Sequence, residues 1–250
     1  MITTIPDLDL ELLYYLDITS IMRLSIISKN EYILISDQQF IKDLRLLKKI
    51  NMDKIIDYAA KNNYISIIQW VSNSVHDFEY SDEAIDYAAG NGNIAILDWF
   101  DKSMYEFKYS KDAFVFASMH GYVFILDWFD KSQHKFKNSK YAISFACHNG
   151  HINVLDWYDK SKYKFKYTIW AINYAAENGK INVLDWFAKS PYGFIYTDYA
   201  IDKASENGYI DVLIWFKNSP YKYTDYALKL AKRNNHKNIL DWFETNISKI

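Results

Sequence analysis

The sequence predicts an all-α solenoid, a linear stack of helix-turn-helix repeats. A tryptophan recurs every 29 residues from Trp70 to Trp215, and Trp242 follows 27 residues later. Most of the intervals carry an Asn-Gly pair shortly before the next tryptophan, which is typical of a chain reversal at the end of a helix. A fixed period of this length indicates a repeat array, in which each unit contacts only its neighbours.

Seven repeats are assigned to residues 52–250, behind a separate N-terminal helical segment, residues 1–51. Their boundaries are 52–80, 81–109, 110–138, 139–167, 168–196, 197–223 and 224–250. All but the first begin with Ser or Thr, whose hydroxyl can cap the first helix of the repeat. The eighth position is always alanine, which predicts that neighbouring first helices approach closely: Ala59, Ala88, Ala117, Ala146, Ala175, Ala204 and Ala231.

The second helix of each repeat has apolar residues three and four positions apart, as in Ile181, Val183, Leu184, Trp186 and Phe187. This spacing favours a helix over a strand, and it predicts that the recurring tryptophans belong to the buried core. An aspartate stands four residues before a lysine, as in Asp185 and Lys189, so we expect ion pairs on a solvated face. A loop with a recurring Phe closes each repeat.

The repeat resembles an ankyrin unit. Ala175-Ala176-x-x-Gly179, followed by Ile181-x-Val183-Leu184-x-Trp186-Phe187, is similar to the ankyrin run Ala-Ala-x-x-Gly-His-x-x-Val-Val-x-x-Leu-Leu, and this resemblance covers residues 52–250. Two features differ: Ala84-Ile85-Asp86 replaces Pro-Leu-His, and the period is shorter than the ankyrin 33. We therefore expect compact aromatic loops in place of β-fingers. Such divergent units look like those of giant DNA viruses that infect amoebae.

Residues 1–51 resemble an F-box. Ile5-Pro6-Asp7, Tyr15-Leu16-Asp17, Arg23-Leu24-Ser25-Ile26-Ile27-Ser28-Lys29 and Ile35-Ser36-Asp37 follow the order of that motif. Ile18 replaces a usual proline, and Phe40 or Ile41 replaces the closing tryptophan. The resemblance implies that the segment docks the linker subunit of a cullin-type ubiquitin ligase through Pro6, Leu16, Ile21, Leu24 and Ile27. The alternative is a helical cap, which covers the first open face of a repeat array.

Composition limits the compartment and the class of partner. The net charge of −2 gives no general electrostatic reason to bind nucleic acid. The single Cys147 fits a reducing compartment. The chain shows no signal peptide and no apolar run long enough to cross a membrane. We expect a monomer that is intracellular, in the cytoplasm of a host cell if the viral resemblance holds, and not secreted.

The sequence shows no catalytic motif and no cofactor-binding motif, so we expect a protein that is not an enzyme and has no cofactor. His148 and His151 lie beside Cys147, but Gly150 separates them at a predicted turn, and we expect no metal site. The loop residues Lys162, Lys164 and Lys166 alternate with aromatic residues, as do Lys135 and Lys137. We interpret this pattern as a soluble rim, with a basic patch for a specific partner as the second choice.

Trp170 is the one tryptophan outside the repeat pattern. It occupies the third position of its repeat, in the first turn of the first helix, and it either contacts a partner or packs on a neighbouring aromatic side chain. Residues on the same helix face in other repeats extend this candidate surface. We expect protein binding there, and the candidate residues are Glu83, Asp86, Asp112, Lys140, Tyr141, Trp170, Asn173, Tyr199, Asp202 and Tyr226.

Overall fold

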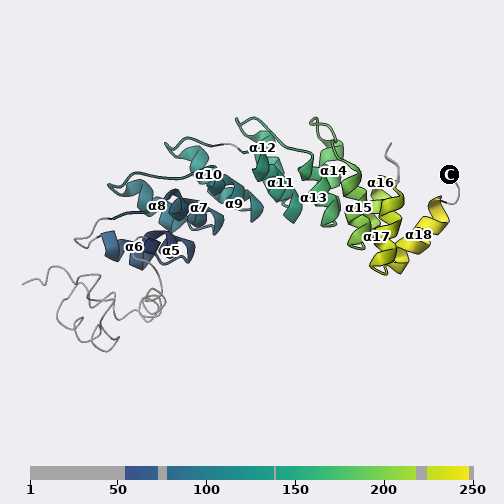
Figure 1. Cartoon of the computed structure of the whole chain (residues 1–250). Helices are drawn as coiled ribbons and strands as arrows, with labels where there is room; N and C mark the ends of the chain where they lie inside the picture. Colours follow the sequence, from purple (N-terminus) through teal and green to yellow (C-terminus); the bar gives the residue numbers. More distant parts are fainter. Residues whose placement is uncertain (1–53, 73–77, 138, 218–223, 248–250) are drawn as a thin grey trace, which may run out of the picture. The chain divides into compact units, whose positions relative to one another are not determined.

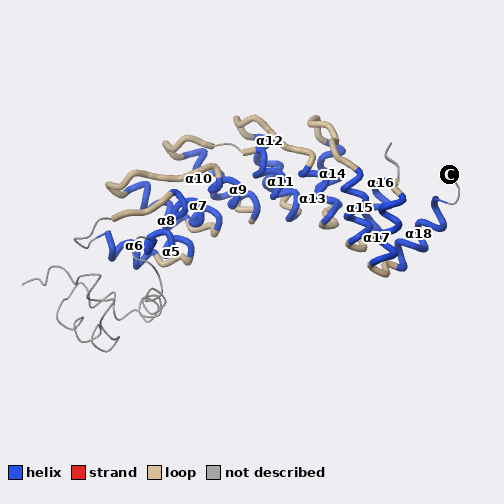
Figure 2. The backbone as a smooth tube through the Cα atoms, viewed as in Figure 1, coloured by secondary structure: helices blue, strands red, loops and turns tan. Residues whose placement is uncertain are grey.

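The computed structural model describes residues 54–72, 78–137, 139–217 and 224–247. In these ranges every regular element is a helix and no strand occurs, as the sequence predicts (Figure 2). The chain divides into two compact units, residues 1–113 and 114–250, which we call unit 1 and unit 2 and describe separately.

Unit 1 contains two helix pairs. α5 (Ile55–Lys61) packs on α6 (Ile65–Ser72), and α7 (Asp82–Gly90) packs on α8 (Ile94–Lys102). α5 also packs on α7, so the first helices of successive pairs are neighbours (Figure 1). α9 (Asp112–Met119) begins at the end of unit 1 and runs into unit 2.

Unit 2 continues the same order of helices. After α9 come α10 (Val123–Lys131), α11 (Lys140–Asn149), α12 (Ile152–Lys160), α13 (Trp170–Glu177), α14 (Ile181–Lys189), α15 (Asp198–Glu206), α16 (Ile210–Phe216), α17 (Asp225–Arg233) and α18 (Lys237–Ile247). α11, α13, α15 and α17 pack in succession, and α10, α12, α14 and α16 form a second row. This packing between sequential neighbours is compatible with a helical solenoid.

The predicted caps and turns are present where the residues are described. The hydroxyls of Ser81, Ser139 and Thr224 accept backbone N–H groups at the starts of α7, α11 and α17. Glycines in the left-handed conformation follow the first helices in most of the turns, as at Gly92 and Gly179. Glycine adopts this conformation without a Cβ clash. Asn63 takes that conformation at φ 61° and Asn235 at φ 58°, in the two turns that lack glycine.

The core is built from small residues on the first helices and larger ones on the second. The alanine at the eighth position is fully buried in each of the seven predicted repeats. A close contact between first helices leaves no space for a larger side chain there. The second helices supply aliphatic pairs such as Val183 and Leu184, and from α8 onward each adds one buried ring, such as Phe187.

The prediction that the periodic tryptophans belong to the buried core is wrong. The buried ring is the next residue along the chain: Phe100, Phe129, Tyr158, Phe187, Phe216 and Phe243. The tryptophans from Trp99 onward are only half-buried. Trp186, for example, stacks at a 5.4 Å centroid distance on Phe165 from the preceding loop. The recurring loop phenylalanine therefore covers the indole, and the two rings together close the side of the helix pair.

On the second helices, hydrogen bonds from indole N–H groups replace most of the expected aspartate–lysine ion pairs. Asp98 and Lys102 lie 3.7 Å apart on α8. In unit 2, however, Asp127, Asp156 and Asp185 each accept a hydrogen bond from the indole N–H of the next repeat. A half-buried indole N–H needs an acceptor, and the carboxylate of the preceding second helix provides it.

Candidate protein-binding surface

Two of the candidate surface residues have structural roles instead. Asp86 is 5% exposed, and its carboxylate accepts both the backbone N–H and the hydroxyl proton of Ser110, which precedes the next first helix. Asn173 is 1% exposed and makes the equivalent contacts with Thr197. Both were placed on the outer face because their spacing was read from one helix alone. They face the next repeat, and neither belongs to an accessible surface.

Asp202 repeats this arrangement in part. It is half-buried, and it accepts a hydrogen bond from the hydroxyl of Thr224 ahead of α17. Burial raises the pKa of Asp202, and the bond from Thr224 partly offsets that effect. This carboxylate therefore acts mainly in joining α15 to the start of α17.

The four aromatic candidates in unit 2 form a row of side chains across the first helices, here called the aromatic row. Tyr141, Trp170, Tyr199 and Tyr226 occupy the same position on α11, α13, α15 and α17. These helices pack in succession, so the four side chains lie on consecutive neighbours. Tyr141 is 45% exposed, Trp170 38% and Tyr226 56%, while Tyr199 is half-buried. The row is therefore largely open to solvent.

Trp170 is the best-supported member of the row. Its ring stacks on Tyr174, one helical turn further along α13, at a centroid distance of 5.3 Å. Tyr199 from α15 meets it edge-on at 5.4 Å. The sequence left two interpretations of Trp170 open, contact with a partner or packing on a neighbouring aromatic side chain. In the structure the indole packs on two tyrosines and is also exposed. An indole held on two sides has little side-chain freedom left to lose when a partner binds.

Charged groups surround the middle of the row. The Tyr199 hydroxyl donates to both carboxylate oxygens of Glu177 at 3.1 Å. Burial, followed by the charge and hydrogen bond of Glu177, raises the pKa of Tyr199. Further along α15, the Lys203 ammonium bonds to Glu206, which also pairs with Arg233, and these cations lower the pKa of the Glu206 carboxyl. The aromatic surface therefore has polar, hydrogen-bonded borders, as binding surfaces commonly do.

The remaining candidates are more scattered. Lys140 is exposed at the start of α11, with its ammonium 5.4 Å from the centre of the Tyr141 ring. Glu83 is exposed on α7, and Asp112 is half-buried at the start of α9, both in unit 1. The structure therefore brings together the aromatic members in unit 2, with Lys140 beside them.

Two residues of this surface were missed from the sequence. Tyr174 stacks on Trp170, and Phe145, which is 36% exposed, follows Tyr141 by one helical turn. Side chains four residues apart share a helix face. That spacing, applied to the third position of each repeat, was the signal that could have identified both.

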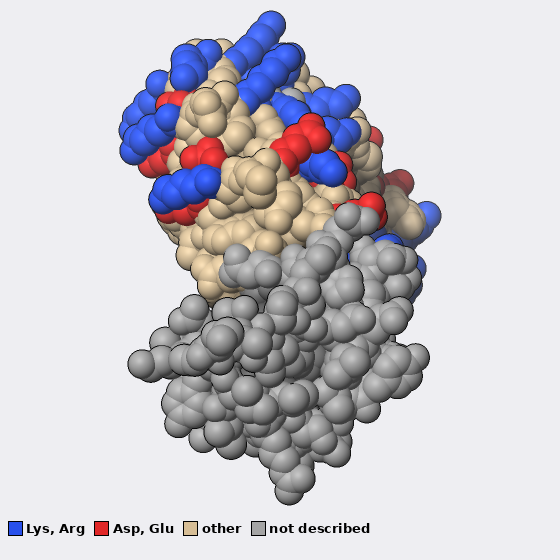
Figure 3. Space-filling view, turned by 90° about the vertical axis from the view of Figure 1, so that its left-hand side faces the viewer, with Lys and Arg blue, Asp and Glu red and all other residues tan. Residues whose placement is uncertain are grey.

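In the loops, the basic side chains extend into solvent and the aromatic side chains pack against the helices. Between α12 and α13, Lys162, Lys164 and Lys166 are exposed, whereas the alternating Tyr163 and Phe165 are half-buried. Phe165 stacks on Tyr192 at 4.0 Å as well as on Trp186, so its faces are covered and not open to a nucleobase. On the face drawn in Figure 3, Lys and Arg side chains are interspersed with Asp and Glu. In the loop between α12 and α13 the basic side chains are therefore solvated, while the rings between them belong to the packing.

The residues considered for metal binding have other contacts. Cys147 is fully buried, and burial raises the pKa of its thiol. The His148 ring bonds to Asn178, and the His151 ring lies against Gly121. No group of His, Cys, Asp and Glu suited to a metal ion occurs among the described residues. Over the same residues, none of the helices has the length and apolar character needed to cross a membrane.

The predicted adaptor-docking residues, Pro6, Leu16, Ile21, Leu24 and Ile27, lie outside the described residues. Comparison with known proteins adds no assignment, because no family model matches the chain and no curated protein matches it significantly. The aromatic row on the first helices of unit 2 is therefore the candidate site with the most direct structural support.

Proposed function

We propose that this chain is a non-catalytic protein-recognition module that binds its target through the aromatic row, with Trp170 at its centre. The observation that carries the proposal is the 38% exposed indole held between Tyr174 and Tyr199. Tryptophan and tyrosine dominate the energetics of many protein interfaces, because each buries a large surface when a partner covers it. Exposed apolar patches commonly mark interaction sites, and the exposure of the aromatic row supports the proposal in this way.

The repeat character of residues 52–250 supports the same function. Their resemblance to ankyrin units, assigned as seven repeats, implies an array whose successive first helices offer one extended contact surface. The buried Asp86 and Asn173 hold successive repeats together and leave the aromatic side chains for a partner. In this proposal the partner is an intracellular protein, and a host protein if the resemblance to viral ankyrin units holds.

Affinity capture from a cell lysate with the full-length chain tests this function. The chain is compared with its Trp170→Ala variant and with Ile195→Ala, which removes a 54% exposed apolar side chain from a loop. We expect at least one protein to be retained by the parent and by Ile195→Ala, and to fall by about tenfold or more with Trp170→Ala. Thermal melting must show that both variants remain folded. Identical sets of captured proteins for all three chains would contradict the proposal.

The resemblance of residues 1–51 to an F-box favours a more specific role. In that role the chain is a substrate-recruiting adaptor, and Pro6, Leu16, Ile21, Leu24 and Ile27 dock the linker subunit of a cullin-type ubiquitin ligase. The alternative is a passive scaffold that sequesters its target, with residues 1–51 serving only as a cap.

Binding of the purified linker subunit separates these two roles. We expect the full-length chain to bind it, the Leu16→Asp/Leu24→Asp variant to lose binding, and Trp170→Ala to bind as the parent does. A parent chain that captures a target but not the linker would remove the adaptor role and leave the passive scaffold.

A further inference from the structure

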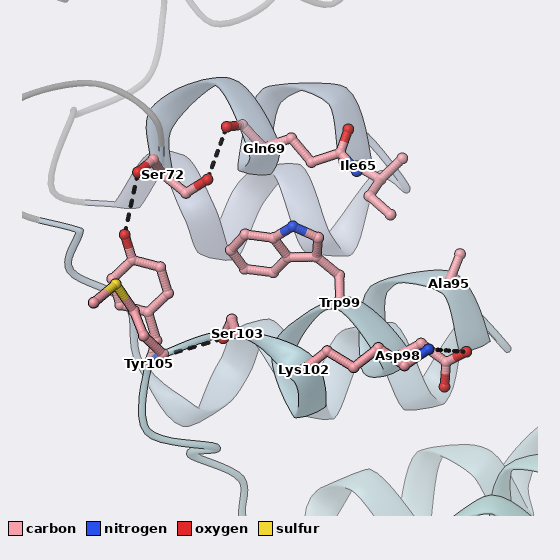
Figure 4. A pocket seen from close by; sticks show the side chains of 10 residues that line it. Ile65, Gln69, Ser72, Ala95, Asp98, Trp99, Lys102, Ser103 and Tyr105 are labelled. Carbon is pink, nitrogen blue, oxygen red and sulfur yellow. Dashed lines mark hydrogen bonds and ion pairs between the residues drawn. The ribbon is translucent and has the colours of Figure 1, made fainter.

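An open groove lies in unit 1 between α6 and α8. It has a volume of about 600 Å³, which is within the range of ligand-binding sites. Trp99 stands between the two helices, with Gln69 on the α6 side and Lys102 on the α8 side (Figure 4). The groove is also lined by the apolar side chains of Ile65, Ala95 and Met104.

The equivalent junctions of unit 2 show what the Trp99 indole lacks. In three of them an indole N–H donates to an aspartate thirty positions earlier: Trp157 to Asp127 at 2.6 Å, Trp186 to Asp156 at 2.7 Å and Trp215 to Asp185 at 2.8 Å. Thirty positions before Trp99 stands Gln69. Along the chain this position holds Asp98, Asp127, Asp156 and Asp185, and the non-acidic residues Gln69 and Ile214.

The glutamine does not replace the missing carboxylate. In Figure 4 its side chain runs along α6 toward Ile65, and no bond joins it to the indole nitrogen. The described residues provide no other acceptor for the Trp99 N–H. The indole is nevertheless held in position, because Phe78 packs against it at 5.6 Å and Tyr105 stacks on it at 6.1 Å. A fixed donor therefore lies in an open groove with its usual partner absent.

The neighbouring polar groups add further N–H donors beside the Trp99 indole, together with one carboxylate, that of Asp98. The Lys102 ammonium is 75% exposed, and its contact with Asp98 is long, at 3.7 Å. The Gln69 amide adds two further N–H donors. The hydroxyls of Ser72 and Ser103 already donate to backbone carbonyls, and the Tyr105 hydroxyl donates to the backbone of Ser72. The Trp99 N–H and the two N–H groups of the Gln69 amide thus make no hydrogen bond among the described residues.

We propose that the groove between α6 and α8 binds an acidic side chain of a partner protein. Its carboxylate accepts the Trp99 N–H in the way that Asp127, Asp156 and Asp185 accept an indole N–H within the chain. Lys102 adds a charge-assisted contact, and Ile65 and Met104 contact the apolar part of the same peptide. The inference concerns a different surface from Trp170, so loss of either site leaves the other testable.

The full-length chain is titrated with the peptide acetyl-Leu-Asp-Leu-amide while the indole N–H signals are followed by ¹H–¹⁵N NMR. Trp99→Phe assigns the Trp99 signal. We expect the Trp99 signal to move downfield on titration. The affinity for acetyl-Leu-Asn-Leu-amide should be lower by about tenfold or more, because a neutral amide is a poorer hydrogen-bond acceptor than a carboxylate. Lys102→Gln should also weaken binding of the aspartyl peptide.

Gln69→Asp is the decisive variant, because it supplies the carboxylate that the other junctions have. The substituted position is exposed on α6, so the fold should tolerate the change. We expect the Trp99 signal of this variant to shift downfield without peptide and its affinity for the aspartyl peptide to fall by about tenfold or more. Gln69→Asn is the matched control, because it has the shape of Asp but keeps an amide, and it should bind the aspartyl peptide more tightly than Gln69→Asp does.

Three results would overturn the inference. The first is an unmoved Trp99 signal at saturating peptide. The second is equal binding of the aspartyl and asparaginyl peptides. The third is a Trp99 signal that already lies downfield in the free parent chain and moves back when acidic residues of the chain itself are replaced. None of these results would bear on whether the aromatic row binds a target, so the two proposals fail independently.

Discussion

At the scale of single residues, buried polar side chains connect each repeat to the next. Asp86 bonds to Ser110, Asn173 to Thr197 and Asp202 to Thr224, always from one first helix to the residue that precedes the next. A buried polar group without a partner would destabilise the fold, so these pairs must form together. Asp86 and Asp202 make this connection with a carboxylate, whereas Asn173 makes it with a neutral amide.

This difference gives a pH-dependent prediction for Asp86. Burial raises the pKa of Asp86 above the usual aspartate range, although both bonds from Ser110 oppose the effect. The folded chain then binds this proton more tightly than the unfolded chain does. The contribution of Asp86 to the free energy of unfolding is therefore largest below its unfolded pKa, and it declines as pH rises toward the folded pKa.

Asp86→Asn tests this prediction, because it introduces the amide that Asn173 already uses. We expect the stability of the parent relative to the variant to fall as pH rises from about 3 to about 6 and then to stay constant. At neutral pH the two should differ by about 1 kcal/mol or less. Urea unfolding of both chains across this range measures the difference. A parent that gains on the variant with rising pH would contradict a raised pKa.

At the scale of helices, the second-helix row is joined by indole–carboxylate bonds and by stacked rings. Trp186 donates to Asp156 on the preceding second helix, while Phe165 from the loop between them stacks on the same indole. Tyr192 completes the cluster, and its hydroxyl donates to Asp159. The loop aromatic residues therefore belong to the packing of the helix pair, and the loops stay compact without forming a strand.

A double-mutant cycle on Asp156 and Trp186 measures this junction. We expect Asp156→Ala and Trp186→Phe to be coupled by about 1.5–3 kcal/mol, because the bond has a charged acceptor and is partly buried. Asp185 with Trp186 is the matched control, because Asp185 accepts from Trp215 instead. Urea unfolding of the single and double variants gives both couplings. Equal couplings for the two pairs would show that the indole–carboxylate bond adds nothing specific.

At the scale of the whole chain, the period predicted the helical elements well because it reflects local physics. Capping hydroxyls, left-handed turn residues and apolar spacing act within one helix or one turn, as at Ser81 and Asn63. The sequence alone could not show which face of a first helix meets the next repeat. Asp86 and Asn173 therefore looked exposed, and the half-buried tryptophans looked like core. The special position of Gln69 became visible only when the bonds between successive second helices were known.

A linear array also predicts that a defect remains local. Ala175 is fully buried on α13, which packs on α11, α14 and α15. Ala175→Leu would force these helices apart, and overpacking of this kind destabilises a core by about 1–3 kcal/mol. Because stability in repeat arrays is the sum of local and nearest-neighbour contributions, we expect the loss to be concentrated around that site.

Hydrogen exchange followed by mass spectrometry tests this expectation. Ala175→Leu should increase exchange in α11 through α15, while α5 through α8 in unit 1 should exchange as in the parent. The matched control is Tyr226→Leu, at a 56% exposed position, which should leave both regions unchanged. A uniform increase along the whole chain would instead mean that the array unfolds as one cooperative body, because hydrogen exchange reports the smallest opening that frees each amide.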